Sequence, residues 1–145
     1  MRGAAEALPF QSASIDVVIC RLVLPYTHNA ATLSEISRVL RNGGALLLKY
    51  HHARYYLRRA IGALAARRWG VLRHDVLVLV CGALYQVTGW QSRTRLREIF
   101  QTERTIRRLL RDRELAISRE MPDSNPQTPS YAITRRAQLL AAKLR

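Results

Sequence analysis

The pattern that most constrains the fold is a strand–helix–strand sequence near the start of the chain. Residues 15–20 are β-branched and apolar after a polar stretch, which predicts a buried strand. Residues 30–41 repeat apolar side chains at helical spacing, with Asn29 as the N-cap and the Asn-Gly-Gly of 42–44 as a left-handed stop. Residues 45–48 form a second apolar run. Strands joined through a helix run parallel, so the sequence predicts an α/β fold.

The middle of the chain, residues 53–90, is predicted to be a helical insertion. Leu57, Ile61 and Leu64 mark one face of a first helix, and the arginines of this segment lie off that face. Residues 76–85 are apolar on all sides, and their length favours a buried helix over a strand.

The last third of the chain predicts two helices followed by two strands. Residues 92–100 and 102–112 keep apolar positions at helical spacing, with Thr102 as the cap of the second helix. The strands Leu115–Ser118 and Tyr131–Thr134 are separated by a loop with three prolines, and an antiparallel pair is the simplest connection between them.

Composition limits the classes of function. With 145 residues, of which 48% are hydrophobic, the chain is long enough for one compact domain. The net charge is +14, but only Lys49 and Lys143 of the 24 basic residues are lysine, which indicates a composition bias as much as a polyanionic partner. Cys20 and Cys81 lie far apart within apolar runs, which indicates reduced thiols, no metal site and a cytoplasmic location.

No targeting or membrane-spanning segment is predicted. The first ten residues contain one arginine and lack the apolar core of a signal peptide. The longest apolar stretch, Val76–Tyr85, is well short of the ~20 residues that a spanning helix needs. The sequence therefore predicts a protein that is not integral to the membrane.

Three motifs follow one another in the first third of the chain. They are Ala5-Glu6-Ala7-Leu8-Pro9-Phe10, Ser14-Ile15-Asp16-Val17-Val18 and Glu35-Ile36-Ser37-Arg38-Val39-Leu40-Arg41-Asn42-Gly43-Gly44. In this order and spacing, and with the predicted strand pair at the other end, they resemble the class I S-adenosylmethionine-dependent methyltransferases, in particular those similar to methyltransferase type 11. The resemblance is close over residues 3–50 and extends loosely through residues 92–137.

The resemblance implies a Rossmann-like sheet with the strand order 3-2-1-4-5-7-6 and an antiparallel seventh strand. Residues 1–145 would then be a partial methyltransferase domain that begins after the third strand, with a cap-like insertion at 53–90. The Gly-rich turn and the acidic residue that hold the methionyl and ribose parts of S-adenosylmethionine belong to the first two strands, and the chain contains no Gly-x-Gly-x-Gly. We therefore expect the isolated chain to bind this cofactor weakly or not at all.

The resemblance also places residues beside the cofactor. Ala5 and Glu6 match a segment whose backbone amides contact the adenine, although a solvated loop charge explains Glu6 equally well. Cys20 and Arg21 match the end of the fourth strand, and Tyr26 stands where relatives commonly have His. Ligands of open α/β sheets bind at the carboxyl ends of strands, which favours these three positions. The alternatives are a packed small hydrophobe for Cys20 and a surface charge for Arg21.

His51 and His52 follow the fifth strand, where this family binds its acceptors. A neutral histidine there can take the acceptor's proton, and at most one of the two acts, because adjacent side chains point different ways. Two partly exposed loop histidines are the alternative, because methyl transfer can depend on positioning alone. The aromatic residues of the insertion suggest either a lipophilic acceptor pocket or a small core under the cap. These residues are Tyr55, Tyr56, Trp69, Tyr85 and Trp90.

Three functions remain open on the sequence. The first is S-adenosylmethionine-dependent methyl transfer to an unidentified small or lipophilic acceptor, with the isolated chain inactive. The second is a non-catalytic basic module whose arginines between positions 93 and 119 bind an anionic membrane surface or nucleic acid. Acidic residues interrupt this run and no nucleic-acid motif is present, so specific nucleic-acid binding is not expected.

The third function is that of a methyltransferase remnant that pairs with another chain, either a missing amino-terminal half or a second copy. The strand at residues 15–20 is the predicted point of contact. Its natural neighbour, the first strand of the complete fold, is not in this sequence, so we expect it at an exposed edge of the sheet.

Overall fold

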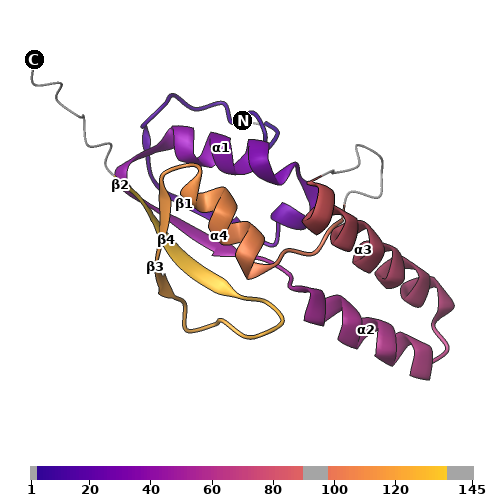
Figure 1. Cartoon of the computed structure of the whole chain (residues 1–145). Helices are drawn as coiled ribbons and strands as arrows, with labels where there is room; N and C mark the ends of the chain where they lie inside the picture. Colours follow the sequence, from indigo (N-terminus) through magenta and orange to yellow (C-terminus); the bar gives the residue numbers. More distant parts are fainter. Residues whose placement is uncertain (1–2, 90–97, 137–145) are drawn as a thin grey trace, which may run out of the picture.

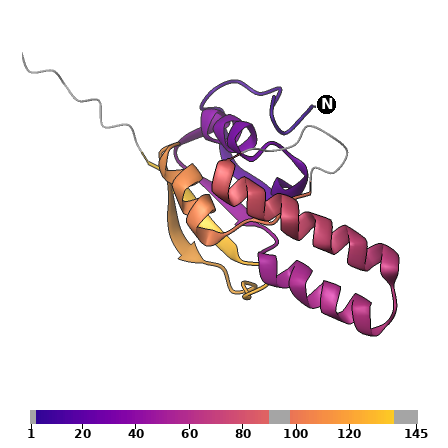
Figure 2. The same ribbon diagram turned by 45° about the vertical axis from the view of Figure 1, so that its right-hand side comes forward.

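The structure is a computed structural model that describes residues 3–89 and 98–136 (Figure 1). Its strands form one sheet, two helices lie against that sheet, and two further helices form a hairpin that projects away from it (Figure 2). In chain order the elements are β1 (Ile15–Arg21), the short 3-10 helix η1 (Leu24–Tyr26), α1 (Asn29–Val39), β2 (Leu40–Lys49), α2 (Ala53–Ala65), α3 (Trp69–Thr88), α4 (Glu103–Arg111), β3 (Leu115–Glu120) and β4 (Ser130–Arg135).

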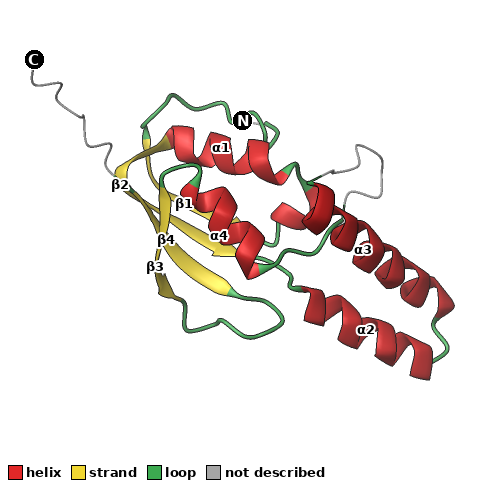
Figure 3. Ribbon diagram, in the orientation of Figure 1, coloured by secondary structure: helices red, strands yellow, loops and turns green. Residues whose placement is uncertain are grey.

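The sheet has the strand order β1-β2-β4-β3 (Figure 3). β1 and β2 are parallel, with Val18 opposite Leu46 and Cys20 opposite Leu48, whereas β4 is antiparallel to both of its neighbours. This is the order that the resemblance implies for the fourth, fifth, seventh and sixth strands. The predictions of an α/β fold, of a terminal antiparallel pair and of an edge position for β1 are confirmed.

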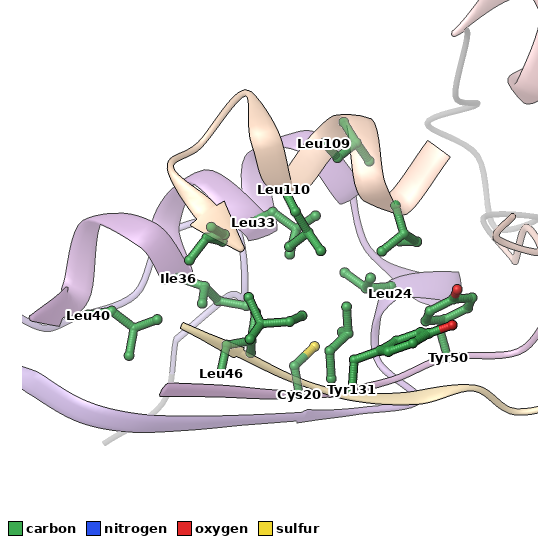
Figure 4. Packing of buried hydrophobic residues seen from close by; sticks show 14 residues of the cluster. Cys20, Leu24, Leu33, Ile36, Leu40, Leu46, Tyr50, Leu109, Leu110 and Tyr131 are labelled. Carbon is green, nitrogen blue, oxygen red and sulfur yellow. The ribbon is translucent and has the colours of Figure 1, made fainter. Parts of the chain in front are cut away.

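The hydrophobic core lies between this sheet and helices α1 and α4 (Figure 4). Leu46 of β2 and Ile133 of β4 are opposite each other in the register, and both are fully buried. Leu33 and Ile36 of α1 and Ile106 of α4 belong to the same cluster. Full burial of one such side chain stabilises the fold by roughly 1.5–3 kcal/mol, so this layer holds the sheet and its helices together.

The other face of β1 is not covered by the part of the chain that the structure describes. Val18 and Cys20 pack against the core, but the alternating residues Val17 and Ile19 are 53% and 70% exposed. The buried strand that the sequence predicts is thus buried on one face only. Because β1 is an edge strand and the helices lie on one side of it, half of its side chains stay exposed.

Both ends of α1 differ from the prediction. The N-cap is His28 and not Asn29, because His28 Nδ1 accepts a hydrogen bond from the Ala31 amide at 3.3 Å and Asn29 is the first residue of the helix, fully buried. At the other end the chain passes at Leu40 directly into β2 in an extended conformation. The left-handed residue is Gly43, with φ +78°, and it lies within β2 where the register with β1 is irregular.

α2 and α3 form a hairpin whose buried side differs from the predicted one. α2 buries Tyr56, Ala60 and Ala63, and α3 buries Val78 and Tyr85. The apolar residues that were expected to be covered are instead exposed, and they are Leu57, Ile61, Leu64, Val76, Val80 and Leu84. Helical periodicity locates the apolar stripes correctly, but other residues of the two helices are the buried ones and the stripes remain outside.

The length of α3 corrects a second expectation. It has 20 residues, twice the length of the apolar run at 76–85, because helix formation extends into its charged first turns. By length and composition alone it is able to cross a membrane.

α4 begins as the sequence predicts, with the Thr105 amide donating to Thr102 Oγ1 at 3.3 Å. Of the helix predicted over residues 92–100, positions 92–97 lie outside the described residues, and the other three are not helical. There Ile99 donates its amide to the Pro25 carbonyl at 3.1 Å, so a contact with the segment after β1 replaces helical bonding. Trp90 also lies outside the described residues.

Candidate functional site

The carboxyl ends of β1 and β2 lie side by side and form a rim where the predicted site residues gather. The register places Arg21 opposite Lys49, so the segments that follow the two strands begin at the same edge of the sheet. η1 follows β1, and residues 50–52 lead from β2 into α2. The rim is therefore also the base of the helical hairpin (Figure 1).

Cys20 lies in the core at the end of β1 (Figure 4). It is 4% exposed, and burial raises the pKa of its thiol to about 11. Such a thiol is protonated at neutral pH, so Cys20 serves as a small hydrophobic side chain and not as a nucleophile. The next residue, Arg21, is exposed. Contact of either residue with the cofactor stays a prediction.

The carboxylate of Glu98 is contacted by side chains from three elements at the rim. Tyr26 Oη, from η1, donates to Glu98 Oε1 at 3.1 Å, and Tyr56 Oη, from α2, donates to the same oxygen at 2.7 Å. His74 Nε2, from α3, lies 3.1 Å from Glu98 Oε2. We call Tyr26, Tyr56, His74 and Glu98 the Glu98 cluster. The Glu98 cluster connects both helices of the hairpin to the segment that follows β1.

The two phenols of the Glu98 cluster are held in their neutral form. Burial raises the pKa of Tyr56 most, and the hydrogen bond to the Glu98 carboxylate raises it further. Burial also raises the pKa of Tyr26 most, followed by the negative charge of Glu98 and the hydrogen bond to it. Both phenols therefore remain hydrogen-bond donors at physiological pH.

His51 lies against the aromatic side chains of α2. Its ring stacks on that of Tyr55 with centroids 4.1 Å apart and meets Tyr56 edge-on at 5.8 Å. Burial lowers the pKa of His51, and the charge of Glu98 opposes this shift without cancelling it. The imidazole is thus neutral at pH 7 and has a lone pair that can accept a proton. His51 Nδ1 has no hydrogen-bond partner among the residues that the structure describes.

His52 has different surroundings, as expected for adjacent side chains. It is the N-cap of α2, where its Nδ1 accepts from the Arg54 amide at 3.4 Å. Its own amide donates to the Gln127 carbonyl at 2.9 Å. Burial lowers the pKa of His52 as well. The His52 ring caps the first turn of α2, whereas the His51 ring lies among the aromatic residues beside the Glu98 cluster.

Ala5 and Glu6 belong to a loop that is fastened to α1. Glu6 Oε1 accepts a hydrogen bond from the His28 amide at 2.9 Å, so this carboxylate is used at the start of the helix. The loop is held again where the Leu8 amide donates to Glu35 Oε2 at 2.9 Å. The predicted contact of Ala5 and Glu6 with adenine rests on the resemblance alone.

The hydrogen bond from the Leu8 amide to Glu35 makes the stability of this loop depend on pH. Hydrogen bonds from Arg38 and the Leu8 amide lower the pKa of Glu35 to about 2, from an ordinary value of 4.5. Because the folded-state pKa is the lower one, the stabilisation is complete above pH 4.5 and is lost as the pH falls toward 2. We expect Glu35→Gln to remove this part of the pH dependence, measured as the free energy of unfolding in urea at a series of pH values. The exposed Glu120→Gln is the control, and identical profiles for both variants would contradict the assignment.

The residues that organise the base of the hairpin escaped the sequence analysis. Asp75 is fully buried, and Arg59 Nε donates to its Oδ2 at 2.8 Å. The guanidinium carbon of Arg59 also lies 5.6 Å from the centroid of the Tyr55 ring. The signal that could have found Asp75 is its position as the single acidic residue between 53 and 88. No comparable signal marks Glu98, whose partners are distant in the sequence.

Of the arginines in the second hypothesis, Arg93, Arg95 and Arg97 lie outside the described residues, and those of α4 occupy another surface. Four arginines of α4 line one hollow together with residues of α3 and of the α4 cap, and the lining consists of Gln86, Thr102, Glu103, Arg104, Thr105, Arg107, Arg108 and Arg111. Arg107 is paired with Glu103 at 2.7 Å. The hollow shares no residue with the Glu98 cluster. Within residues 3–89 and 98–136, no three His, Cys, Asp or Glu side chains are grouped to hold a metal ion.

The resemblance assigns the loop of Ala5 and Glu6 to the adenine side of S-adenosylmethionine, and Arg21 and Tyr26 are exposed at the rim. Cys20, in contrast, is buried, and the sequence has no Gly-x-Gly-x-Gly turn for the methionyl part. Binding of the adenine end by these residues stays a prediction.

Known proteins share the fold of this chain. A family model described as a methyltransferase domain matches residues 1–48, and no curated protein matches the chain. A solved S-adenosylmethionine-dependent methyltransferase from Methanosarcina mazei is similar with a TM-score of 0.57 and 18% identity, over 94% of this chain and 66% of that one. A second, from Mesorhizobium loti, gives a TM-score of 0.60 and 14% identity, over 93% and 68%. The YcgJ protein from Bacillus subtilis gives 0.58 and 13%, over 94% and 70%.

These matches and the strand order define the class of fold. The chain has the fold of the class I S-adenosylmethionine-dependent methyltransferases. The part that matches the family model comprises the first loop, β1, α1 and most of β2. The chain spans 66% of the length of the Methanosarcina structure and 68% of the Mesorhizobium structure, and at these identities the likeness defines the fold alone.

Proposed function

We propose that this chain takes part in S-adenosylmethionine-dependent methyl transfer to a small or lipophilic acceptor that binds beside the Glu98 cluster. The observation that carries the proposal is the gathering of His51 and the Glu98 cluster at the carboxyl ends of β1 and β2. In open α/β sheets this edge is where ligands bind. The methyltransferase fold supports the reaction class, and the rim supports the acceptor class.

The aromatic character of the rim supports an acceptor with an apolar or ring-shaped part. Tyr26, Tyr55, Tyr56 and His51 all lie there, and Tyr26 is 52% exposed. Rings of this kind bind apolar groups by stacking, while their polar edges orient a ligand. Tyr26 and Tyr56 donate their phenolic protons to Glu98, which fixes the positions of both rings, and of the two only Tyr26 is exposed to a ligand.

His51 is the proposed proton acceptor. When bound, S-adenosylmethionine supplies an activated methyl group, and an oxygen or nitrogen acceptor needs a free lone pair to receive it. The lowered pKa of His51 keeps its imidazole neutral and able to take the acceptor's proton. His52, which caps α2, is assigned no part in this step.

The methionyl end of the cofactor needs a binding element that this sequence does not contain. The outer edge of β1 pairs with no other strand of the described chain, and Val17 and Ile19 beside it are exposed. Such an edge is a template for a further strand. We propose that a polypeptide segment with a Gly-rich turn pairs here and completes the cofactor site; a second copy of this chain is the alternative occupant.

The cofactor part of the proposal is tested by saturation-transfer NMR of S-adenosylmethionine with the purified chain. We expect weak binding in which the adenine protons are saturated and the methylene protons of the methionyl part are not, because only the adenine end has a binding element. Tyr26→Ala should reduce the adenine signal by about threefold, which is well under 1 kcal/mol. Trp69→Ala, which removes another exposed aromatic ring, should leave that signal unchanged.

Two results would overturn this division of the cofactor site. Tight, saturable binding with one site per chain would mean that the methionyl end is held by residues present here. Complete absence of adenine saturation would favour the non-catalytic remnant.

A further inference from the structure

The hairpin of α2 and α3 presents an apolar outer surface. Among the described residues it carries eight of the twelve large hydrophobic side chains that are exposed, including Trp69 at 65% and Val87 at 86%. We call these eight the outer stripe, and they are Leu57, Ile61, Leu64, Trp69, Val76, Val80, Leu84 and Val87. Exposed apolar surface of this extent marks a binding surface.

The interior of the hairpin holds an ion pair beside apolar residues such as Ala60 and Val78, and its outside is apolar. The Asp75 carboxylate is fully buried and paired with Arg59, and His74 on the same turn of α3 reaches Glu98. Only 22% of the most apolar window of α3 is buried, although its mean hydropathy is 1.3. In a hairpin surrounded by water most large apolar side chains are covered. The exposure of the outer stripe therefore suits a hairpin whose outside contacts an apolar medium.

The residues of the outer stripe follow one side of each helix. Leu57, Ile61 and Leu64 are spaced by four and three residues on α2, as are Val80, Leu84 and Val87 on α3. On α3 this side is opposite to the buried residues Val78 and Tyr85. On α2 each residue of the stripe directly follows a buried one, so the stripe lies roughly 100° around the helix from the buried side. Because the hairpin projects from the sheet, the stripes are not covered by α1, α4 or the strands (Figure 2).

The exposed charges of the hairpin are all positive. Arg54, Arg58, Arg67, Arg68 and Arg73 are exposed, and the single acidic residue between 53 and 88 is the buried Asp75. A second copy of the hairpin placed on the outer stripe would bring arginines against arginines without a compensating carboxylate. A surface that is negatively charged at its boundary and apolar beneath it complements both the arginines and the stripe.

From this combination we propose that the hairpin docks on an anionic lipid bilayer, with the outer stripe in the acyl boundary and the arginines at the lipid phosphates. The hairpin lies in the interface and does not span the bilayer. α2 has 13 residues, or roughly 20 Å of helix against the ~30 Å of the hydrocarbon core. In α3, Arg73, His74 and Asp75 occur together in the second turn, where spanning would place them in hydrocarbon. This inference is independent of the proposed methyl transfer.

Vesicle flotation of the full chain tests the docking. Vesicles of phosphatidylcholine mixed with phosphatidylglycerol should bind the chain at least about tenfold more tightly than vesicles of phosphatidylcholine alone. Val80→Gln should weaken binding to the anionic vesicles by about tenfold, because it removes one apolar side chain from the acyl boundary. Arg73→Gln should weaken binding by about fivefold.

Matched variants outside the hairpin serve as controls. Val17 is as exposed as Val80, at 53% against 52%, so Val17→Gln makes the same change in chemistry elsewhere. Arg119→Gln removes an exposed arginine from β3. Both controls should float like the unmodified chain, and circular dichroism checks that all four variants are folded.

Each other outcome overturns the proposal. Absence of flotation, equal binding to both kinds of vesicle, or equal losses for the hairpin variants and the controls would exclude docking through the outer stripe. Light scattering decides between the two remaining occupants. If the chain does not float and forms a dimer that Val80→Gln dissociates, the outer stripe binds a second copy of the chain. If the chain does not float and is monomeric, the outer stripe is a surface for another protein.

Discussion

Arg59→Met should lower the free energy of unfolding by about 3 kcal/mol, the lower end of what breaking a buried ion pair costs. Arg59 is partly exposed, but its partner Asp75 is not exposed at all. Removing the guanidinium therefore leaves a carboxylate in the interior of the hairpin without the cation that compensates it. His74 Nδ1, 3.3 Å from the same carboxylate, is too weakly placed to replace three hydrogen bonds from Arg59. Urea unfolding followed by circular dichroism gives the measurement.

The double variant Arg59→Met/Asp75→Leu separates the cost of an unpaired charge from the value of the pair. With both charges removed, apolar side chains fill the interior, and we expect most of the lost stability to return. Equal losses in the single and double variants would show that Arg59 acts through packing on Tyr55 and Tyr56, over whose rings it also lies.

Local sequence patterns were enough to locate the elements of the sheet layer. β1, α1, β3 and β4 occur close to where apolar runs and helical spacing place them, and β2 contains the predicted run at 45–48 but begins earlier, at Leu40. The strand order came from the resemblance, since pairing between β2 and β4 joins residues more than 80 positions apart and leaves no local trace. The N-cap of α1 was missed by one residue, because His28 and Asn29 both carry a suitable acceptor.

The hairpin was predicted in position but not in orientation. Periodicity shows that Leu57, Ile61 and Leu64 share a face, and it does not show what covers that face. The usual assumption that the apolar face is the buried one fails here, because Asp75 and Arg59 occupy the interior. A single acidic residue within an apolar helix, here Asp75, is the sequence signal that argues against that assumption.

The candidate site was predicted in part for the same reason. His51 and Tyr26 were placed at the rim by their positions after β2 and β1. Glu98, which joins Tyr26 and Tyr56, was not, because these contacts span 72 and 42 residues. If both proposals hold, the Glu98 cluster at the base of a membrane-docked hairpin lies where a lipophilic acceptor leaves the bilayer.

Gly82→Ala should destabilise the protein although alanine is the better helix former. A Cβ at Gly82 of α3 would overlap Cδ1 of the Phe100 ring, so the ring or the helix would have to move. Phe100 is 7% exposed and packs with Tyr56 and Val78, so it has little room to move. Overpacking of this kind costs about 1–3 kcal/mol, which exceeds the ~1 kcal/mol gained from helix propensity.

Gly62→Ala is the matched control, because Gly62 lies within α2 and a Cβ there would meet nothing within 4 Å. It should stabilise the chain by about 0.5–1 kcal/mol. The two substitutions are chemically identical and are expected to shift the urea midpoint in opposite directions. Pairing Gly82→Ala with Phe100→Leu, which shortens the opposing side chain, should cost less than the sum of the two single variants. A stabilising Gly82→Ala would mean that α3 does not approach residue 100 as closely as this packing requires.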